Sequence, residues 1–172
     1  MESIDRYDAE LLTPTMLNDL SNEMKSKFGF MLDKLGRESA ISQQLNDPIT
    51  SLEKLLSPAA ASHNLIVCRN NDNIIGYLKY GKKDLYFYKK DGKVVQSSPI
   101  CLLDFYVSDI YQRQGIGLLL FKNMLEVLSI NPCVFAYDRP SPKLISFLAK
   151  HYDMKNGDLQ PNRFMIFDGF LL

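Results

Sequence analysis

Several residue types that would narrow the class of protein are rare or missing from this sequence. There is no tryptophan, and only three cysteines occur, Cys68, Cys101 and Cys133, widely spaced and without a C-x-x-C pair. This pattern indicates neither a disulfide framework nor a zinc centre, so we expect a reducing compartment and no bound metal. No apolar run approaches the roughly 18 residues that cross a bilayer, and residues 1–6 are mixed and charged rather than basic and then apolar. We therefore expect a soluble cytoplasmic protein without a membrane partner.

An excess of charge of one sign is also missing. Lysine plus arginine number 20, as do aspartate plus glutamate, so the formal net charge is +0. A balanced chain has no general attraction for nucleic acid, and a charged partner has to be met by a local patch. Residues 79–93 hold six lysines against two aspartates. These lysines form either a basic rim for an acidic partner or an ordinary solvated hairpin.

The composition that is present is that of an ordinary globular protein. Of the 172 residues, 46% are hydrophobic and 23% are charged. A chain of this length buries a sufficient core without metal or disulfide bonds, and no repeat or linker divides it. We expect one domain, residues 1–172, and a monomer.

The spacing of apolar residues predicts helices first and a mixture of strands and helices later. Thr13 and Pro14 form a cap-plus-proline start, and apolar residues recur at helical spacing as far as Gly36, which predicts one long helix. Shorter helices are predicted at 39–45 and, capped by Thr50 or Ser51, up to residue 56. From residue 65, β-rich runs separated by turn sequences predict an antiparallel meander, followed by a β-α-β-α unit. The predicted strands are 65–68, 74–80, 85–88, 100–107, 134–137 and 164–167, and the later helices are 116–128 and 141–152.

A glycine-containing turn joins the strand at 100–107 to the helix at 116–128. Residues 112–117 read Q-R-Q-G-I-G. A helix amino terminus offers unsatisfied N–H groups and about half a positive charge to a phosphate. Gly115 and Gly117 remove side chains that would keep a pyrophosphate away, and the polar residues before them add donors. The alternative is a turn that merely tolerates glycine.

This Q-R-x-G-x-G segment, between a strand and an amphipathic helix, resembles the acetyl-CoA signature of the GCN5-related N-acetyltransferases. Residues 101–107, 138–141 and 147–152 are similar to the α-tubulin N-acetyltransferases of that superfamily, and the likeness covers roughly residues 20–170. The resemblance implies an α/β (α+β) fold with a mixed central sheet, splayed strands and flanking helices. It also implies transfer of acetyl from acetyl-CoA to a lysine on the luminal loop of α-tubulin in microtubules. The implied location is the microtubule cytoskeleton, including the axonemes of cilia or flagella.

Carried over position by position, the resemblance implies three groups of site residues. The catalytic positions are Asp138, Cys101 and Gln43. The cofactor-binding positions are Phe105, Tyr106, Val107, Gln112, Arg113, Gln114, Gly115, Ile116, Gly117, Leu118, Ser141, Pro142, Lys143, Leu144, Phe147 and Lys150. The substrate-binding positions are Ile49, Lys83, Asp104, Arg139, Arg163 and Phe164.

Acid–base chemistry bears on two of these residues. A lysine amine with a pKa of about 10.4 is protonated at neutral pH, so freeing the nucleophile costs about 4–5 kcal/mol. Asp138 can accept that proton, but an ordinary aspartate pKa of about 4 has to be raised, or a water has to relay. Cys101, with an ordinary pKa of about 8.5, can be a second acid or base, donate a proton to the departing CoA thiolate or form a covalent acetyl-cysteine. Alternatively it is a small apolar filler of its strand.

Strand alternation bears on Asp104. In a regular strand Cys101 and Asp104 point to opposite faces, so both line one site only if the strand carries a bulge. If the strand is regular, we assign Asp104 to structure or to the substrate-facing surface. Arg139 either binds substrate or pairs with a carboxylate, for which Asp138 is a candidate.

Four positions depart from the family pattern. Gln114 stands where histidine is frequent, Ile116 where a small or polar residue is frequent, Lys54 where arginine stands and Arg163 where asparagine stands. The glycines are intact, so cofactor binding is expected, whereas the last two departures bear on substrate affinity. Two alternative functions remain open: acetylation of another protein lysine or a small amine, and a non-catalytic module that binds microtubules or CoA.

Overall fold

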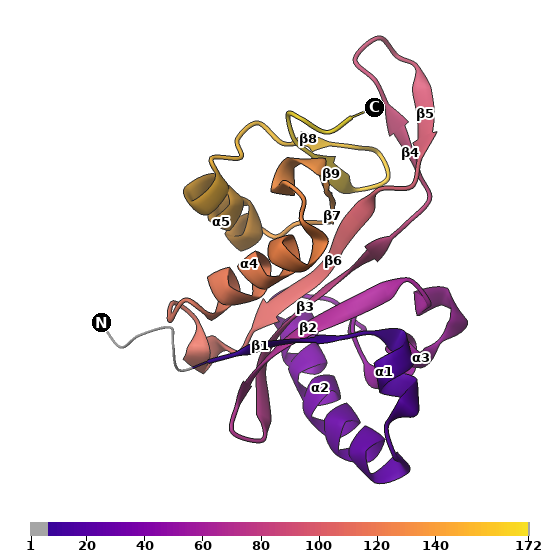
Figure 1. The fold of residues 1–172 in the computed structure, drawn as a ribbon. Helices are drawn as coiled ribbons and strands as arrows, with labels where there is room; N and C mark the ends of the chain where they lie inside the picture. The colour runs from indigo at the N-terminus through magenta and orange to yellow at the C-terminus, as the bar shows by residue number, and fades with distance from the viewer. Residues whose placement is uncertain (1–6, 172) are drawn as a thin grey trace. The chain divides into compact units, whose positions relative to one another are not determined.

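The computed structural model describes residues 7–171, which form two compact units (Figure 1). The first unit runs up to Tyr80 and resumes over Asp104–Val127, and the second comprises Gly81–Leu103 and the chain from Leu128 onward. Whether residues 1–172 behave as the single predicted domain stays a prediction. None of the helices within residues 7–171 has the length and apolar character that crossing a bilayer requires.

The first unit contains most of the helices. Its elements are β1 (Ala9–Leu12), α1 (Pro14–Asp19), α2 (Asn22–Ser42), α3 (Leu52–Leu56), β2 (His63–Asn70), most of β3 (Asn73–Lys82), half of β6 (Ile100–Val107) and α4 (Ile116–Leu128), with 3₁₀ turns at Pro58–Ala60 and Asp109–Tyr111. Strand β1 pairs antiparallel with β2, with Ala9 opposite Cys68. The helix predicted to end at residue 56 and the helix predicted at 116–128 are confirmed.

The predicted single helix that ends at Gly36 is wrong. Thr13 caps α1 as expected, but Leu20 has an extended backbone that ends this helix, and Ser21 caps a second one. Helix α2 then continues through Gly36 to Ser42, so the short helix predicted at 39–45 is its last part. A Cβ on Gly36 would lie closer than 3.0 Å to the backbone oxygen of Thr50. The glycine therefore permits a close approach inside the helix instead of ending it.

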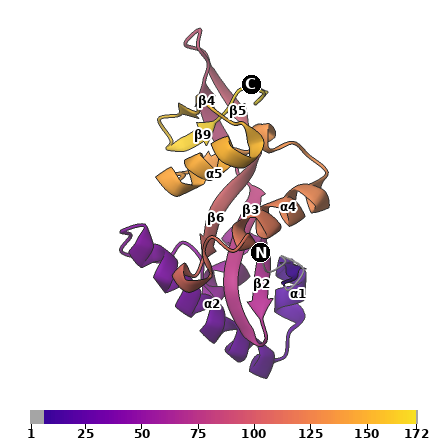
Figure 2. The same ribbon diagram turned by 90° about the vertical axis from the view of Figure 1, so that its left-hand side faces the viewer.

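One face of α2 packs on β2 and β3, as Figure 2 shows from the side. Full burial of a leucine or phenylalanine side chain on this face stabilises the fold by about 1.5–3 kcal/mol relative to an exposed side chain. The core of the first unit consists of Leu12, Leu17, Phe28, Leu32, Leu35, Leu55, Leu65, Val67, Ile74, Tyr77 and Tyr106.

The second unit is built around short strands. Its elements are β4 (Leu85–Tyr88), β5 (Val94–Ser97), the start of β6, a 3₁₀ turn at Pro132–Val134, β7 (Ala136–Asp138), α5 (Pro142–Tyr152), β8 (Asp158–Leu159) and β9 (Phe164–Ile166). The predicted strand at 134–137 begins later than expected because Asn131 and Pro132 form a capped turn. The core of this unit consists of Phe87, Cys101, Leu103, Ala136, Phe164 and Ile166.

Seven strands form one sheet in the order β1-β2-β3-β6-β7-β9-β8. It mixes parallel and antiparallel pairs, because β6 and β7 are parallel while β7 and β9 are antiparallel. The predicted mixed sheet with flanking helices is confirmed. The predicted meander is only partly right, because β4 leaves this sheet and forms a two-stranded antiparallel hairpin with β5.

Candidate active site

The turn at residues 112–117 leads from the 3₁₀ turn Asp109–Tyr111 into α4. Gly115 has φ +85°, a left-handed conformation that glycine adopts without strain. The side chain of Gln112 donates hydrogen bonds to the carbonyl oxygen of Val107 (2.9 Å) and to the carboxylate of Asp109 (2.7 Å). Gln112 therefore braces the turn, whereas the sequence suggested a donor to a ligand.

The remaining donors of this turn are exposed or lie on the backbone. The side chain of Gln114 donates to the carbonyl oxygen of Ile110 (3.0 Å), so it too holds the turn. Arg113 is exposed and has φ +62°. The first-turn N–H groups of an α-helix such as α4 lack intrahelical partners, and they attract an anion. An exposed arginine beside a helix amino terminus suits a pyrophosphate.

Gly117 supplies an independent observation that favours a ligand. Gly117 is the second residue of α4, and glycine is a poorer helix former than alanine. A Cβ on Gly117 would meet only the ring of Phe105, at 3.4 Å, which is an ordinary contact. Packing within the protein therefore does not require glycine here, whereas a pyrophosphate lying against the helix would. The residues present fit the phosphate part of acetyl-CoA.

Two of the predicted cofactor residues have buried side chains. Tyr106 is 8% exposed and belongs to the core of the first unit, and Ile116 is 1% exposed. Burial raises the pKa of Tyr106 to about 12. Any contribution of these two residues to a cofactor site comes from their backbone, while Phe105, Val107 and Leu118 are half-buried.

Helix α5 carries the second group of predicted cofactor residues. Ser141 caps it by accepting a hydrogen bond from the N–H of Leu144 (3.2 Å), with Pro142 in the first turn, as the sequence predicted. The ring centroids of Phe147 and His151 lie 4.8 Å apart. The exposed members of the predicted set on this helix are Pro142, Lys143 and Lys150.

The end of β7 brings four predicted residues together. Asp138 lies opposite Phe164 in the antiparallel register, and the N–H of Arg139 donates to the carbonyl oxygen of Arg163 (3.0 Å). The Nε atom of Arg139 lies 3.5 Å from Asp138 Oδ1, so Arg139 pairs with the carboxylate that the sequence suggested. The side chain of Arg139 is 62% exposed and that of Asp138 is 16% exposed. The carboxylate of Asp138 is therefore largely buried and paired with a cation.

The structure places Cys101 in the core of the second unit. Its side chain is fully buried, and its Sγ lies 3.5 Å from the carbonyl oxygen of Pro99. Burial raises the pKa of the thiol to about 12, and nearby Asp138 raises it further while Lys83 lowers it by less than burial raises it. The thiol is therefore protonated at neutral pH and is a poor nucleophile. This favours the interpretation of Cys101 as a filler of the strand.

Three further predicted residues lie in the first unit. Gln43 is the C-terminal cap of α2, and its Nε2 donates to Ser39 Oγ (2.9 Å). The carbonyl oxygen of Ile49 accepts from Lys79 Nζ (2.9 Å). Asp104 is 6% exposed, and its carboxylate accepts hydrogen bonds from Thr50 and Tyr77, which favours the structural assignment.

Sequence reasoning missed several polar residues around these three. They are Ser39, Thr50, Tyr77 and Lys79, all at most 6% exposed. Lys79 left a signal, because it is a lone charge in an apolar strand. Nothing in the sequence around Thr50 and Tyr77 indicates their roles, because their hydrogen-bond partners are distant in the sequence.

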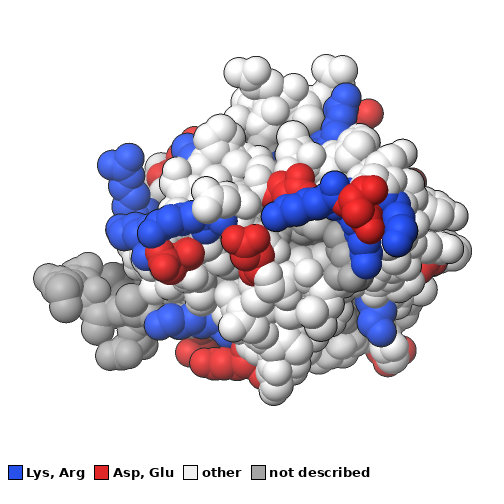
Figure 3. All heavy atoms as spheres, turned by 90° about the horizontal axis from the view of Figure 1, so that it is seen from above, with Lys and Arg blue, Asp and Glu red and all other residues white. Residues whose placement is uncertain are grey.

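The cluster of lysines at 79–93 is smaller than the sequence suggested, because Lys79 is buried. Lys83 is exposed, and its N–H donates to the carbonyl oxygen of Pro99 (3.3 Å). Lys93 pairs with Asp91 at 3.6 Å. In the face drawn in Figure 3, basic side chains stand beside acidic ones. A rim of one sign is not evident in that view.

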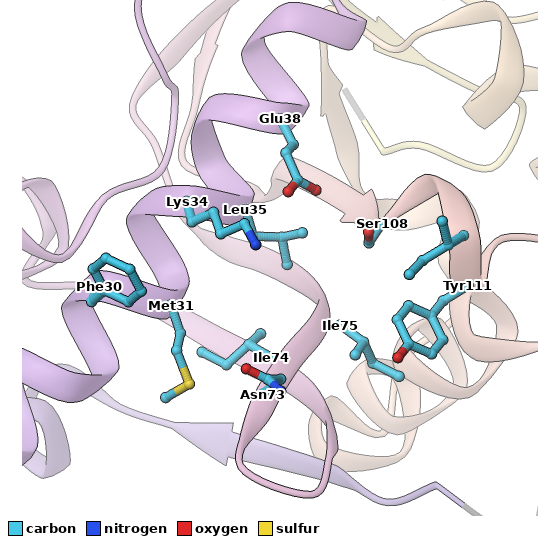
Figure 4. A pocket seen from close by; sticks show the side chains of 11 residues that line it. Phe30, Met31, Lys34, Leu35, Glu38, Asn73, Ile74, Ile75, Ser108 and Tyr111 are labelled. Carbon is cyan, nitrogen blue, oxygen red and sulfur yellow. The ribbon is translucent and has the colours of Figure 1, made fainter.

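A cavity of about 250 Å³ lies in the first unit between α2, the start of β3 and residues 108–111. Figure 4 shows side chains such as Lys34, Glu38 and Tyr111 around it. None of the residues that the sequence assigned to the site lines this cavity. Within residues 7–171, no group of three or more His, Cys, Asp or Glu side chains is arranged to hold a metal ion.

The chain is similar over its whole length to a known family. A sequence profile described as "GNAT acetyltransferase, Mec-17" matches residues 1–172. The chain is 42% identical over 146 residues to "Alpha-tubulin N-acetyltransferase 1" of Danio rerio, covering 81% of this chain and 48% of that protein. It is 37% identical over 151 residues to the "Alpha-tubulin N-acetyltransferase" of Tetrahymena thermophila, covering 88% of this chain and 37% of that protein. It is 38% identical over 154 residues to the "Alpha-tubulin N-acetyltransferase" of Phytophthora infestans, covering 81% of this chain and 86% of that protein. The chain thus spans about half or less of the first two relatives.

Solved structures share the fold. A Trypanosoma brucei acetyltransferase has a TM-score of 0.52 at 17% identity, covering 90% of this chain and 96% of that chain. An aminoglycoside acetyltransferase from an uncultured soil metagenomic sample, in complex with trehalose, has a TM-score of 0.51 at 19% identity, covering 87% of each chain. At these identities the similarity concerns the fold alone.

Proposed function

This chain belongs to the Mec-17 family of GNAT acetyltransferases, and from that premise we propose that it transfers the acetyl group of acetyl-CoA to a lysine side chain of α-tubulin. The observation that carries the proposal is the match over residues 1–172, together with the name that the relatives share. We propose as acceptor the lysine on the luminal loop of α-tubulin in microtubules. The enzyme then acts as a monomer on cytoplasmic microtubules, including those of cilia or flagella.

The donor side of the proposed reaction is the amino terminus of α4. Acetyl-CoA supplies an activated acetyl thioester when it is bound. The N–H groups of the first turn and the guanidinium of Arg113 attract its pyrophosphate, and Gly117 leaves room for it. The braced turn holds these groups in place before the cosubstrate arrives, which reduces the entropy that binding has to overcome.

The acceptor side of the proposed reaction is the end of β7. Asp138 takes a proton from the lysine ammonium, and the free amine attacks the thioester carbonyl carbon, so that a C–N bond forms as the C–S bond breaks. The nitrogen then releases its second proton to solvent, which leaves the neutral amide. The thiolate leaves and takes a proton from solvent. A thiol with a pKa of about 12 is an unfavourable donor to it, because an ordinary thiol has a pKa of about 8.5. We therefore assign Cys101 to packing and Arg139 to holding the carboxylate of Asp138.

The test is incubation with acetyl-CoA and taxane-stabilised microtubules, with acetylated lysines mapped by mass spectrometry. We expect acetylation at one α-tubulin lysine, and a loss of rate of at least about 100-fold in Asp138→Asn, the lower range for a positioned general base. Asp168→Asn is the matched control, since Asp168 is an exposed carboxylate of the same unit.

Three outcomes would overturn parts of this proposal. Faster turnover on other lysine proteins or small amines would change the acceptor. Binding of acetyl-CoA without product on any acceptor would indicate a non-catalytic module. Full activity of Asp138→Asn would remove Asp138 as the base.

A further inference from the structure

A chain of buried polar side chains links β3, β6 and the loop before α3 in the first unit. At the end of α2, Gln43 Nε2 donates to Ser39 Oγ (2.9 Å). The Tyr77 hydroxyl donates to Asp104 Oδ2 (2.7 Å), and Thr50 Oγ1 donates to the same oxygen (2.6 Å). The chain therefore ties the segment around Ile49, which the family resemblance assigns to the acceptor site, to two strands of the sheet.

The centre of this chain is a buried carboxylate whose hydrogen-bonding needs are met. Besides the two hydroxyls, the N–H of Phe105 donates to Asp104 Oδ1 (3.0 Å). Burial and the charge of Asp104 raise the pKa of Tyr77 well above its usual range, so its hydroxyl stays a donor. A buried network with all partners in place holds one arrangement, because each broken bond leaves an unsatisfied polar group.

The loop at residues 47–50 is held by several contacts of this kind. Its Thr50 side chain is fully buried and belongs to the network. The carbonyl oxygen of Ile49 accepts from Lys79 Nζ (2.9 Å), and Lys79 is itself 6% exposed. The Nζ atom of Lys54 contacts the carbonyl oxygen of Pro48. The contacts leave the side chain of Ile49 half-buried at the surface while its backbone is fixed.

We propose that Tyr77, Thr50 and Asp104 are positioning residues, which hold the loop around Ile49 in the arrangement that receives the acceptor segment of α-tubulin. This rests on the proposed function. Asp104 then influences substrate binding without touching the substrate, because it is buried and acts through the hydroxyl of Thr50. Recognition of the acceptor is thus set by groups in the interior as well as by the exposed residues.

The test compares Tyr77→Phe and Thr50→Val with the unchanged chain in steady-state kinetics on microtubules. We expect the KM for microtubules to rise about tenfold in each variant, which corresponds to about 1.4 kcal/mol and to the loss of one buried hydrogen bond. The KM for acetyl-CoA should change less than twofold. Thr50→Ser keeps the hydroxyl and should restore the KM for microtubules.

The matched control is Tyr137→Phe. Tyr137 is also fully buried, and its hydroxyl donates to the carbonyl oxygen of Pro132 (2.7 Å), which is outside the network. A merely structural role of Tyr77 would give both variants the same KM for microtubules. That result, or an unchanged KM in Tyr77→Phe, would overturn the inference.

Hydrogen exchange gives a second measurement that does not need turnover. Amides in a peptide covering residues 45–51 should exchange about tenfold faster in Tyr77→Phe and Thr50→Val than in Tyr137→Phe, in line with the loss of one buried hydrogen bond. Equal exchange in these variants would also overturn the inference. If the unchanged chain acetylates no tubulin, the proposed function is wrong. The exchange rates would then still decide whether the network holds the loop.

Discussion

Replacement of Gly36 by alanine tests the close approach of α2 to the loop before α3. A Cβ at this position would lie within 3.0 Å of the backbone oxygen of Thr50, and 3.4 Å from its carbonyl carbon. Thr50 is fixed by its buried hydroxyl, so its backbone cannot move without loss of another interaction. Overpacking of this kind costs about 1–3 kcal/mol, whereas alanine gains about 1 kcal/mol in a helix. Taking the upper cost, we expect Gly36→Ala to lower the free energy of unfolding by about 2 kcal/mol.

The same substitution at Gly29 serves as its control. A Cβ there would lie 2.8 Å from Leu52 Cδ2, the end of a side chain that can rotate, and 3.5 Å from its Cβ. The helix gain then offsets a small cost, so Gly29→Ala should change stability by less than about 1 kcal/mol. The two variants differ only in whether the obstacle is backbone or a flexible side chain.

Urea unfolding followed by circular dichroism measures both variants, with a thermal melt as a second assay. For a chain of this size, about 2 kcal/mol corresponds to a fall in Tm of about 4–8 °C. The slope of the urea transition should stay unchanged, so that the shift reports stability alone. A Gly36→Ala variant as stable as the unchanged chain would refute the reasoning, and an equal loss in Gly29→Ala would show that the Thr50 contact is not its cause.

Two further predictions concern backbone strain and pH. Arg163 has φ +68°, a conformation that asparagine tolerates better, so Arg163→Asn should raise the free energy of unfolding by about 0.5–1 kcal/mol in urea titrations, and a decrease would contradict this. Burial raises the thiol pKa to about 11 for Cys68 and to about 12 for Cys101. Because these folded-state values are higher than the ordinary thiol pKa of about 8.5, the stability that the protonated thiols contribute is complete below about pH 8.5 and is lost as the pH rises toward 12. Urea titrations should show that the free energy of unfolding falls by about 1.4 kcal/mol per pH unit for each thiol above about pH 9. This fall should be smaller in Cys68→Ala, and a free energy of unfolding that does not change with pH in this range would disprove the prediction.

The fold could be predicted where local chemistry decides the structure. Thr13 and Ser141 were found as caps because a hydroxyl before a proline satisfies N–H groups within the same turn. The break at Leu20 was missed, because apolar residues keep their helical spacing on both sides of it. Gly36 was misread for a different reason, since the chain that it meets follows 14 residues later.

The residues of the candidate site also fall into those that the sequence could predict and those that it could not. The sequence by itself determined the family, the glycine turn before α4 and the place of Asp138 at a strand end, because these depend on contiguous residues. Only the tertiary structure decided that Cys101 is a buried thiol, that Lys79 holds a carbonyl oxygen and that Asp104 is the centre of a network. Burial and hydrogen bonding depend on partners that folding brings together, and Thr50 stands 54 residues before Asp104. A pKa or a buried hydrogen bond is therefore a property of the folded chain and cannot be read from a motif.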